Sequence, residues 1–357
     1  MINNNFWKNK KVLITGHSGF KGSWLSIILH KAGAHLYGYS LKNKNKDSLF
    51  NSANIKKIYK ENKFADIRNK KTLKQFFEKI KPDIAIHLAA QPLVGVSYSY
   101  PTDTFEVNFN GTLNFLNNLR QIKNLKTALI ITSDKCYDNK EWVFSYREND
   151  ALGGKDPYSA SKACSELLFH AYNSSFFKKE KINVASVRGG NVIGGGDWSD
   201  DRLFADIAKS FTYGTYLKIR NPNANRPWQH VLEPLLGYIK LIEKLAKSNF
   251  YSSSWNFGPY ESECVSVSEI INICKKKNFV LKYTKKIKKT SKHEAKNLKL
   301  DITKSVTYLD WRPKLSIDKA LDYTIDWYKF YKNNRKRPKD IYKFTERQIN
   351  SYYNLKI

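Results

Sequence analysis

Three side chains in the middle of the sequence have the types and spacing needed to remove a proton from an alcohol. Tyr158 precedes Lys162 by four residues, and on a helix this spacing places the ammonium beside the phenol. A cation about 4 Å away at an effective dielectric constant near 20 contributes roughly 4 kcal/mol, or about three pKa units. Lys162, helped by a positively charged cofactor ring, can therefore outweigh burial and bring the pKa of Tyr158 near neutrality. The hydroxyl of Ser133, further upstream, can hold the alcohol oxygen.

A glycine-rich segment near the start of the chain can hold a hydride acceptor. Gly16, Gly19 and Gly22 follow a short apolar run, precede a helical pattern and have the spacing Gly-x-x-Gly-x-x-Gly. Glycines allow a sharp turn and the close approach of a pyrophosphate, and the helix N-terminus that follows favours negative charge. An ordinary glycine turn is the alternative, but the strand before it and the helix after it favour dinucleotide binding. This context also favours a catalytic pair over a helix surface pair for Tyr158 and Lys162.

The residues leave the choice between NAD and NADP open. The segment 39–42, where an acid would bind the adenosine ribose, contains no carboxylate. Lys42 or Lys44 can instead attract a ribose phosphate. Asp66, which precedes Ile67, can accept a hydrogen bond from the adenine amino group, or it can belong to the N-terminal region of the next helix.

Two charged residues directly after Ser133 allow a step beyond alcohol oxidation. Once C4 of a sugar is a ketone, its C5 proton is acidic and the C6 hydroxyl needs a proton in order to leave. Asp134 can supply that proton, and Lys135 can stabilise the enolate or take the C5 proton if its pKa falls. A solvated loop pair is an interpretation of equal weight.

A further cluster of polar and aromatic residues lies at 221–231. Arg226 can bind a diphosphate in a forked geometry. Trp228 is more simply interpreted as a core residue, and His230 as a buried histidine with satisfied hydrogen bonds.

The composition is that of a globular protein, with 41% hydrophobic residues in 357 and a net charge of +30. The lysine runs at 275–277 and 285–289 are interpreted as solvated faces, so we expect no specific nucleic-acid binding; a scaffold or nucleic-acid protein should have lost the catalytic set. No apolar run is long enough to span a bilayer, and the first residues lack a signal-peptide layout, so we expect no membrane association. The four cysteines have no metal-type spacing, which predicts no metal site and a cytoplasmic location.

Short apolar runs alternate with helical patterns through the first half of the chain. We expect strands at residues 11–15, 35–39, 83–88, 127–132 and 183–188, and helices at 22–32, 70–80, 104–121, 158–177 and 232–247. This order predicts an α/β fold, a Rossmann-type doubly wound parallel sheet with a smaller, partly interleaved C-terminal substrate-binding lobe. The expected bounds are 1–189 for the dinucleotide domain, completed by about 231–257; 190–230 and 258–328 for the lobe; and 329–357 for a basic tail.

With these motifs placed, the chain resembles the extended short-chain dehydrogenase/reductase superfamily and its family of NAD-dependent epimerases and dehydratases. It is most similar to the CDP-glucose 4,6-dehydratases, over residues of about 6–328. The glycine loop and the Tyr-x-x-x-Lys pair are shared across the superfamily, whereas the Asp134-Lys135 pair and the Arg-Pro-Trp-Gln-His string at 226–230 are far narrower. The other supporting strings lie at 15–25, 87–94, 107–112, 132–137, 190–198, 293–295 and 298–301.

The resemblance implies tightly held NAD and a hydro-lyase that turns CDP-D-glucose into CDP-4-dehydro-6-deoxy-D-glucose, in deoxysugar and lipopolysaccharide biosynthesis. Tyr158 would take the C4 hydroxyl proton, water would leave across C5 and C6, and the hydride would return to C6. Ser133 would orient the C4 oxygen, Asp134 would protonate the leaving hydroxyl, and Lys162 would bind the nicotinamide ribose. The dTDP-sugar dehydratases have Glu where this chain has Lys135, which leaves the identity of the C5 base open.

The resemblance also implies the remaining site residues and the assembly. The catalytic set is Ser133, Asp134, Lys135, Tyr158 and Lys162. Cofactor binding is expected of Gly16, Ser18, Gly19, Phe20, Lys21, Gly22, Asp66, Ile67, Leu88, Ala89, Ala90, Asn108, Tyr158, Lys162 and Arg188. Substrate binding is expected of Gln91, Asn191, Arg202, Arg226, Trp228, Gln229 and His293. A homodimer is expected through the helices that carry Asn108 and Tyr158. The alternative is another nucleotide-sugar 4,6-dehydratase or a 4-epimerase of the same fold, although an epimerase should lack an acid after Ser133.

Overall fold

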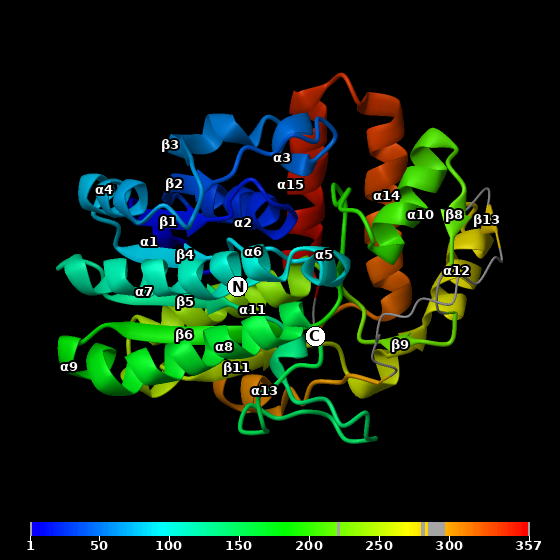
Figure 1. Ribbon diagram of the computed structural model, residues 1–357. Helices are drawn as coiled ribbons and strands as arrows, with labels where there is room; N and C mark the ends of the chain where they lie inside the picture. Colours follow the sequence, from blue (N-terminus) through cyan, green and yellow to red (C-terminus); the bar gives the residue numbers. More distant parts are fainter. Residues whose placement is uncertain (1, 220–221, 280–282, 285–296, 356–357) are drawn as a thin grey trace.

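The computed structural model describes residues 2–219, 222–279, 283–284 and 297–355, arranged as Figure 1 shows. Its centre is a seven-stranded parallel sheet in the order β11-β6-β5-β4-β1-β2-β3. The strands are Lys11–Thr15 (β1), His35–Ser40 (β2), Tyr59–Phe64 (β3), Ile84–His87 (β4), Thr127–Ile131 (β5), Asn183–Gly189 (β6) and Ser254–Phe257 (β11). The predicted Rossmann-type doubly wound fold is confirmed.

Helices cover both faces of the sheet. The longer ones are Phe20–Lys31 (α2), Lys70–Ile80 (α4), Gly111–Gln121 (α7), Pro157–Tyr172 (α8), Leu203–Tyr213 (α10), Leu232–Leu245 (α11), Val267–Lys276 (α12), Ile317–Asn334 (α14) and Pro338–Asn354 (α15). The shorter ones are Asn4–Trp7 (α1), Leu49–Ser52 (α3), Val94–Ser99 (α5), Pro101–Phe105 (α6), Lys178–Glu180 (α9) and Thr303–Leu309 (α13). Their starts follow local rules: the Asn69 side chain caps α4, and Asp156 caps α8 ahead of a proline.

Alternation along the strands divides the core into two layers. Val12 and Ile14 pack into the layer that contains α2, α11 and α15, whereas Leu13 packs into the layer that contains α4, α7 and α8. Strands β4, β5 and β11 are buried along their whole length, as expected for a parallel sheet. Strand β3 was not anticipated because its sequence, Tyr-Lys-Glu-Asn-Lys-Phe, is polar and lies at the sheet edge.

Two of the predicted helices are interrupted. The helix expected at 104–121 consists of α6, a π-helical turn at Glu106–Asn110 (η2) and α7. The helix expected at 158–177 ends as α8 and continues into a second π-helical turn, Asn173–Phe177 (η4). Single-turn π segments often occur near functional sites.

The segments outside the sheet form a lobe beside it (Figure 1). Three short strand pairs belong to it: Val192–Ile193 (β7) with Gln229–His230 (β10), Leu217–Lys218 (β8) with Tyr283–Thr284 (β13), and Asn225–Arg226 (β9) with Val265–Ser266 (β12). The chain leaves the sheet after β6 and returns through α11 and β11, as predicted. The exact domain bounds stay a prediction.

The segment after residue 329, for which only a basic tail was expected, completes α14 and forms α15 as far as Asn354. Ile341, Ile349 and Tyr352 are fully buried, so this segment is part of the core. Within the described ranges, no helix is both long and apolar enough to span a membrane. The same residues contain no group of three or more His, Cys, Asp or Glu side chains that could hold a metal ion.

Candidate active site

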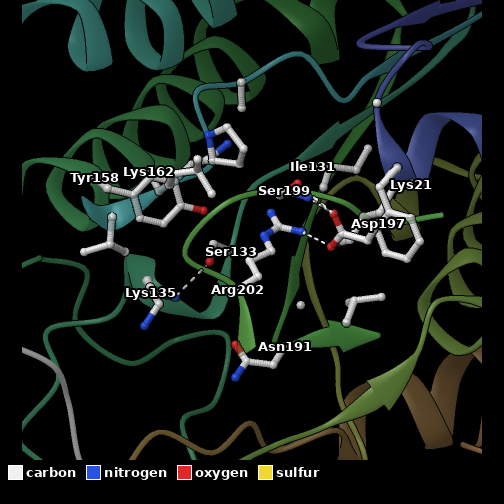
Figure 2. A pocket seen from close by; sticks show the side chains of 18 of the residues that line it. Lys21, Ile131, Ser133, Lys135, Tyr158, Lys162, Asn191, Asp197, Ser199 and Arg202 are labelled. Carbon is white, nitrogen blue, oxygen red and sulfur yellow. Dashed lines mark hydrogen bonds and ion pairs between the residues drawn. The ribbon is translucent and has the colours of Figure 1, made fainter. Parts of the chain in front are cut away.

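The carboxyl ends of β1, β4 and β5 open into a cavity of about 640 Å³. All five predicted catalytic residues line it: Ser133, Asp134, Lys135, Tyr158 and Lys162. Figure 2 shows several of these side chains together with Lys21, Asn191 and Arg202. The parallel sheet therefore brings the glycine loop, the Tyr-Lys pair and parts of the lobe to one place, as the strand order predicts.

The glycine loop has the shape needed to cradle a pyrophosphate. Gly16 has φ +73°, and a Cβ there would lie 2.6 Å from the backbone nitrogen of Ala89. A Cβ on Gly22 would lie 2.5 Å from the carbonyl oxygen of Gly16. Gly19 is the N-cap of α2, and no side chain caps this helix end. These glycines are therefore required by the backbone geometry, and the exposed N-terminus of α2 suits an anion.

The cavity also reaches the carboxyl end of β2, where the adenosine of a dinucleotide is expected. Ser40 ends β2 there and Leu41 follows it, and the Ser18 hydroxyl donates to the Leu41 carbonyl over 2.9 Å. Asp66 lines the cavity but is paired with Arg68 at 2.8 Å. The N-cap of α4 is Asn69, so capping does not explain Asp66.

The phenol of Tyr158 is buried beside Ser133. Burial raises the pKa of Tyr158 to about 12, whereas a hydrogen bond with Ser133 and the positive charge of Arg202 oppose that rise. Burial also lowers the pKa of Lys162 to about 8, and the charges that act on Lys162 are those of Glu166 and Cys136. The near-neutral pKa of Tyr158 expected from Lys162 together with a positive cofactor ring stays a prediction.

Asp134 is a buried acid. It is only 3% exposed, so the interpretation of a solvated loop residue is wrong. Its Oδ1 accepts a hydrogen bond of 2.9 Å from the Ser133 hydroxyl. Burial raises the pKa of Asp134, against the opposing charges of Lys135, Lys21 and Arg226. An acid of this kind can hold a proton for a leaving hydroxyl.

One charged pair in the cavity and part of the environment of Lys21 were not predicted from the sequence. Asp197 and Ser199 also line the cavity, and Asp197 forms an ion pair of 2.9 Å with Arg202. Burial lowers the pKa of Lys21 to about 8, and the charges acting on Lys21 include Arg202, Asp134 and Asp197. The sequence signal that could have identified Asp197 is its position directly after three glycines, at 194–196.

Several predicted ligand residues do not line the cavity. Asn108 donates to Ser161 over 2.9 Å, and Gln91 donates to the Leu93 carbonyl over 3.1 Å. Arg188 is fully buried and pairs with Glu166 at 2.7 Å. The Gln229 amide donates to the Phe257 carbonyl over 3.0 Å. Direct ligand contact by these four residues stays a prediction, and His293 lies outside the described residues.

The aromatic residues of the Arg-Pro-Trp-Gln-His string differ in role. Trp228 packs in the core, as expected, but also lines the cavity and donates to the Val265 carbonyl over 3.2 Å. His230 is buried, as expected. Its Nε2 has no hydrogen-bond partner among the described residues, so the expectation that all its hydrogen bonds are satisfied is wrong. Burial lowers the pKa of His230 to about 3, which keeps the ring neutral.

Comparison with known proteins identifies the family. The family model described as GDP-mannose 4,6 dehydratase matches residues 13–324. The chain belongs to this dehydratase family. A CDP-glucose 4,6-dehydratase of Salmonella typhimurium is 41% identical and aligns over 99% of this chain and 98% of its own length. A UDP-glucuronate 4-epimerase of Thermodesulfobacterium geofontis is 24% identical over 89% of this chain and 95% of its own.

Solved structures share the fold of this dehydratase family member. The UDP-glucuronic acid 4-epimerase of Bacillus cereus, in complex with UDP-glucuronic acid and NAD, has a TM-score of 0.77 at 24% identity. It covers 90% of this chain and 99% of its own. The UDP-glucose 4-epimerase of Thermotoga maritima has the same TM-score of 0.77 at 20% identity, with coverage of 90% and 99%.

Proposed function

We propose that the protein is an NAD-dependent hydro-lyase that converts CDP-D-glucose into CDP-4-dehydro-6-deoxy-D-glucose. The proposal is supported by the 41% identity to a CDP-glucose 4,6-dehydratase over nearly the full length of both chains. The observation that carries it is the arrangement of a buried acid, Asp134, directly beside Ser133 and Tyr158 in one cavity. Oxidation at C4 needs a base such as Tyr158 but no acid, whereas loss of the C6 hydroxyl needs a further proton donor.

In this reaction, the catalytic side chains of the cavity carry out separate steps. Ser133 holds the C4 oxygen, and Tyr158 takes its proton. NAD, when bound over the glycine loop, supplies the hydride acceptor for C4 and the hydride donor for C6. Asp134 gives its proton to the C6 hydroxyl as water leaves, because burial keeps this carboxyl protonated at higher pH than an exposed Asp. Lys162 lies one turn after Tyr158 on α8, where it can bind the nicotinamide ribose.

Lys135 is our candidate for the C5 base. It follows Asp134 in the 3₁₀ turn Asp134–Cys136 (η3) and lines the cavity. Figure 2 shows its side chain below Ser133, directed away from the Tyr158 ring.

Four cavity residues are placed to hold the nucleotide sugar: Asn191, Arg202, Arg226 and Trp228. The two arginines can bind a diphosphate in a forked geometry, and the indole can pack against the sugar or base. The lobe thus supplies the substrate contacts, while the sheet supplies the cofactor contacts.

The test is incubation of the purified protein with CDP-glucose labelled with deuterium at C4. We expect a product lighter by one water, with the label at C6, as measured by mass spectrometry. Inversion at C4 without loss of water would make the protein an epimerase. Preferential dehydration of a dTDP-, GDP- or UDP-sugar would make it a dehydratase of another nucleotide sugar.

We also propose a homodimer and a cytoplasmic role in deoxysugar synthesis for lipopolysaccharide. The helices expected to pair, the one that carries Asn108 (α6, η2 and α7) and α8, which carries Tyr158, lie side by side. On them, Leu167 of α8 is 57% exposed and Phe105 of α6 is 36% exposed. All four cysteines are unpaired, which suits a reducing compartment. The expected dimer should dissociate in Leu167→Lys, which analytical ultracentrifugation can measure; an unchanged mass would place the interface elsewhere.

A further inference from the structure

The loop between β7 and α10 places one acidic and one cationic side chain, Asp197 and Arg202, in the cavity. One carboxylate oxygen of Asp197, Oδ2, accepts a hydrogen bond of 2.9 Å from Nη1 of Arg202. The other, Oδ1, accepts from the Ser199 backbone N–H at 3.1 Å and from the Ser199 hydroxyl at 2.6 Å. The Asp197 side chain is 8% exposed. Both of its oxygens are therefore occupied in fixing the loop and the Arg202 guanidinium.

The rest of the fold holds this loop in place. The Tyr328 hydroxyl on α14 donates to the Asp197 carbonyl over 2.7 Å. A Cβ on Gly195 would lie 2.0 Å from the Trp327 ring, and Gly196 has φ +79° with Leu49 packed against it. The loop is thus wedged between α14 and α3, so the position of Arg202 is built into the protein before any ligand arrives.

Arg202 faces the catalytic phenol. In Figure 2 its guanidinium lies between the Tyr158 hydroxyl and the Asp197 carboxylate. Both Arg202 and Tyr158 line the cavity, and each acts on the ionisation of the other. The arrangement is a row of three groups: carboxylate, guanidinium, phenol.

Other charged groups also lie around the phenol of Tyr158, and the acids among them act on it with the sign opposite to that of Arg202. The charged groups on the elements around Tyr158 include Asp134 and Lys135 on η3, Lys155 and Asp156 before α8, Lys162 and Glu166 on α8, Lys21 on α2, and Asp197, Asp201 and Arg202 on the loop. Asp134 and Asp156 disfavour the phenolate, whereas Arg202 favours it. Lys162 instead interacts with Glu166.

We propose that Arg202 is a positioning residue for proton transfer by Tyr158, and that Asp197 sets how strongly Arg202 acts. The proposal rests on the proposed function, because it assigns Arg202 a part in C4 oxidation beyond substrate binding. The proposal predicts that removing the charge of Arg202 and removing the charge of Asp197 shift the pKa of Tyr158 in opposite directions. Removal of the guanidinium destabilises the phenolate, whereas removal of the Asp197 charge, with the guanidinium kept, stabilises it. A unit charge within roughly 10 Å at an effective dielectric near 20 shifts a pKa by about one unit.

The test reads the ionisation of residue 158 without substrate. Tyr158 is replaced in the full chain by a fluorinated tyrosine, whose lower intrinsic pKa brings ionisation into a range where the protein is folded. The fluorine resonance is then followed against pH. We expect Arg202→Met to raise the midpoint by about one pH unit, Arg202→Lys to restore most of it, and Asp197→Asn to lower it. Asp200→Asn is the matched control, because Asp200 is in the same loop but 89% exposed and outside the cavity lining.

Two results would overturn the proposal. An unchanged midpoint in Arg202→Met would leave Arg202 as a substrate ligand only, and a shift in the same direction for Arg202→Met and Asp197→Asn would indicate general damage to the loop. The same variants are assayed for kcat/KM against pH with CDP-glucose, where the acidic limb should move with the fluorine midpoint. If the wild type does not dehydrate CDP-glucose while the fluorine shifts appear as expected, the proposed function fails, but the effect of Arg202 and Asp197 on the ionisation of Tyr158 is confirmed.

Discussion

The hydroxyl of Tyr352 on α15 donates a hydrogen bond of 2.7 Å to the carboxylate of Glu233 on α11. The same carboxylate accepts the backbone N–H groups of Lys314 at 2.9 Å and Leu315 at 2.7 Å, and Glu233 is 1% exposed. Burial raises the pKa of Glu233 to about 7 in spite of these donors. A single buried carboxyl therefore joins α11, the segment before α14, and α15.

Glu233 makes stability depend on pH. The folded state holds this proton more tightly than the unfolded state, so the free energy of unfolding falls as pH rises from about 4.5 to about 7 and is level above that. The full effect is on the order of 3 kcal/mol. In Glu233→Gln this dependence should vanish, so the melting temperature of the variant should exceed that of the wild type above about pH 7. Glu78→Gln, at an exposed site on α4, is the control; melting curves for Glu233→Gln that run parallel to the wild type at every pH would contradict the assignment.

Tyr158→Phe should abolish oxidation at C4 while the fold survives. The variant loses one hydroxyl in a cavity and no packing in the core, so its melting temperature should stay close to that of the wild type. Loss of the proton acceptor should lower kcat by at least about 100-fold. Reduction of the cofactor, followed by its near-ultraviolet absorbance, is the measurement. Full activity would remove Tyr158 from its role.

Asp134→Asn should separate oxidation from dehydration. The variant keeps a side chain that can accept from Ser133 but cannot give up a proton, so the ketone at C4 should still form. Loss of water should slow by about 100-fold or more. Rapid quenching and mass spectrometry would detect the oxidised sugar before dehydration. If both steps ran at the wild-type rate, the proton donor would be a different group.

Lys21→Met should move the pH dependence of the dehydration step. The Lys21 ammonium lowers the pKa of Asp134, so its removal should raise that pKa further and extend the protonated, active form to higher pH. The alkaline limb of kcat, measured at saturating NAD, should shift upward by about one pH unit. Lys31→Met on the same helix, 43% exposed and paired with Glu346, should leave that limb in place. A downward shift would show that the charge of Lys21 does not act on Asp134.

The strands and the catalytic pair could be predicted because their signals are local. Four-residue apolar runs such as Ile84–His87 end where the chain must turn, and the spacing of Tyr158 and Lys162 fixes both on one face of α8. The general rules of parallel sheets then bring the carboxyl ends of these strands, and the residues that follow them, to one edge.

The rest depended on contacts between distant parts of the chain. Arg188 has the type and position of a ligand residue, but its partner Glu166 is 22 residues away, and only the fold shows that the two charges satisfy each other. The electrostatics of Tyr158 likewise depend on Arg202, which belongs to another part of the chain. No local pattern reports the burial of Asp134, which is what sets it apart from a solvated loop residue.

The packing of α15 has a consequence for how the protein is made. α15 packs against α2, the helix that begins at the glycine loop, and Lys31 on α2 lies 3.7 Å from Glu346 on α15. A chain still growing on the ribosome has its cofactor cradle but not the helix that closes the core beneath it. Catalytic competence should therefore arise late, only after residues 338–354 have emerged.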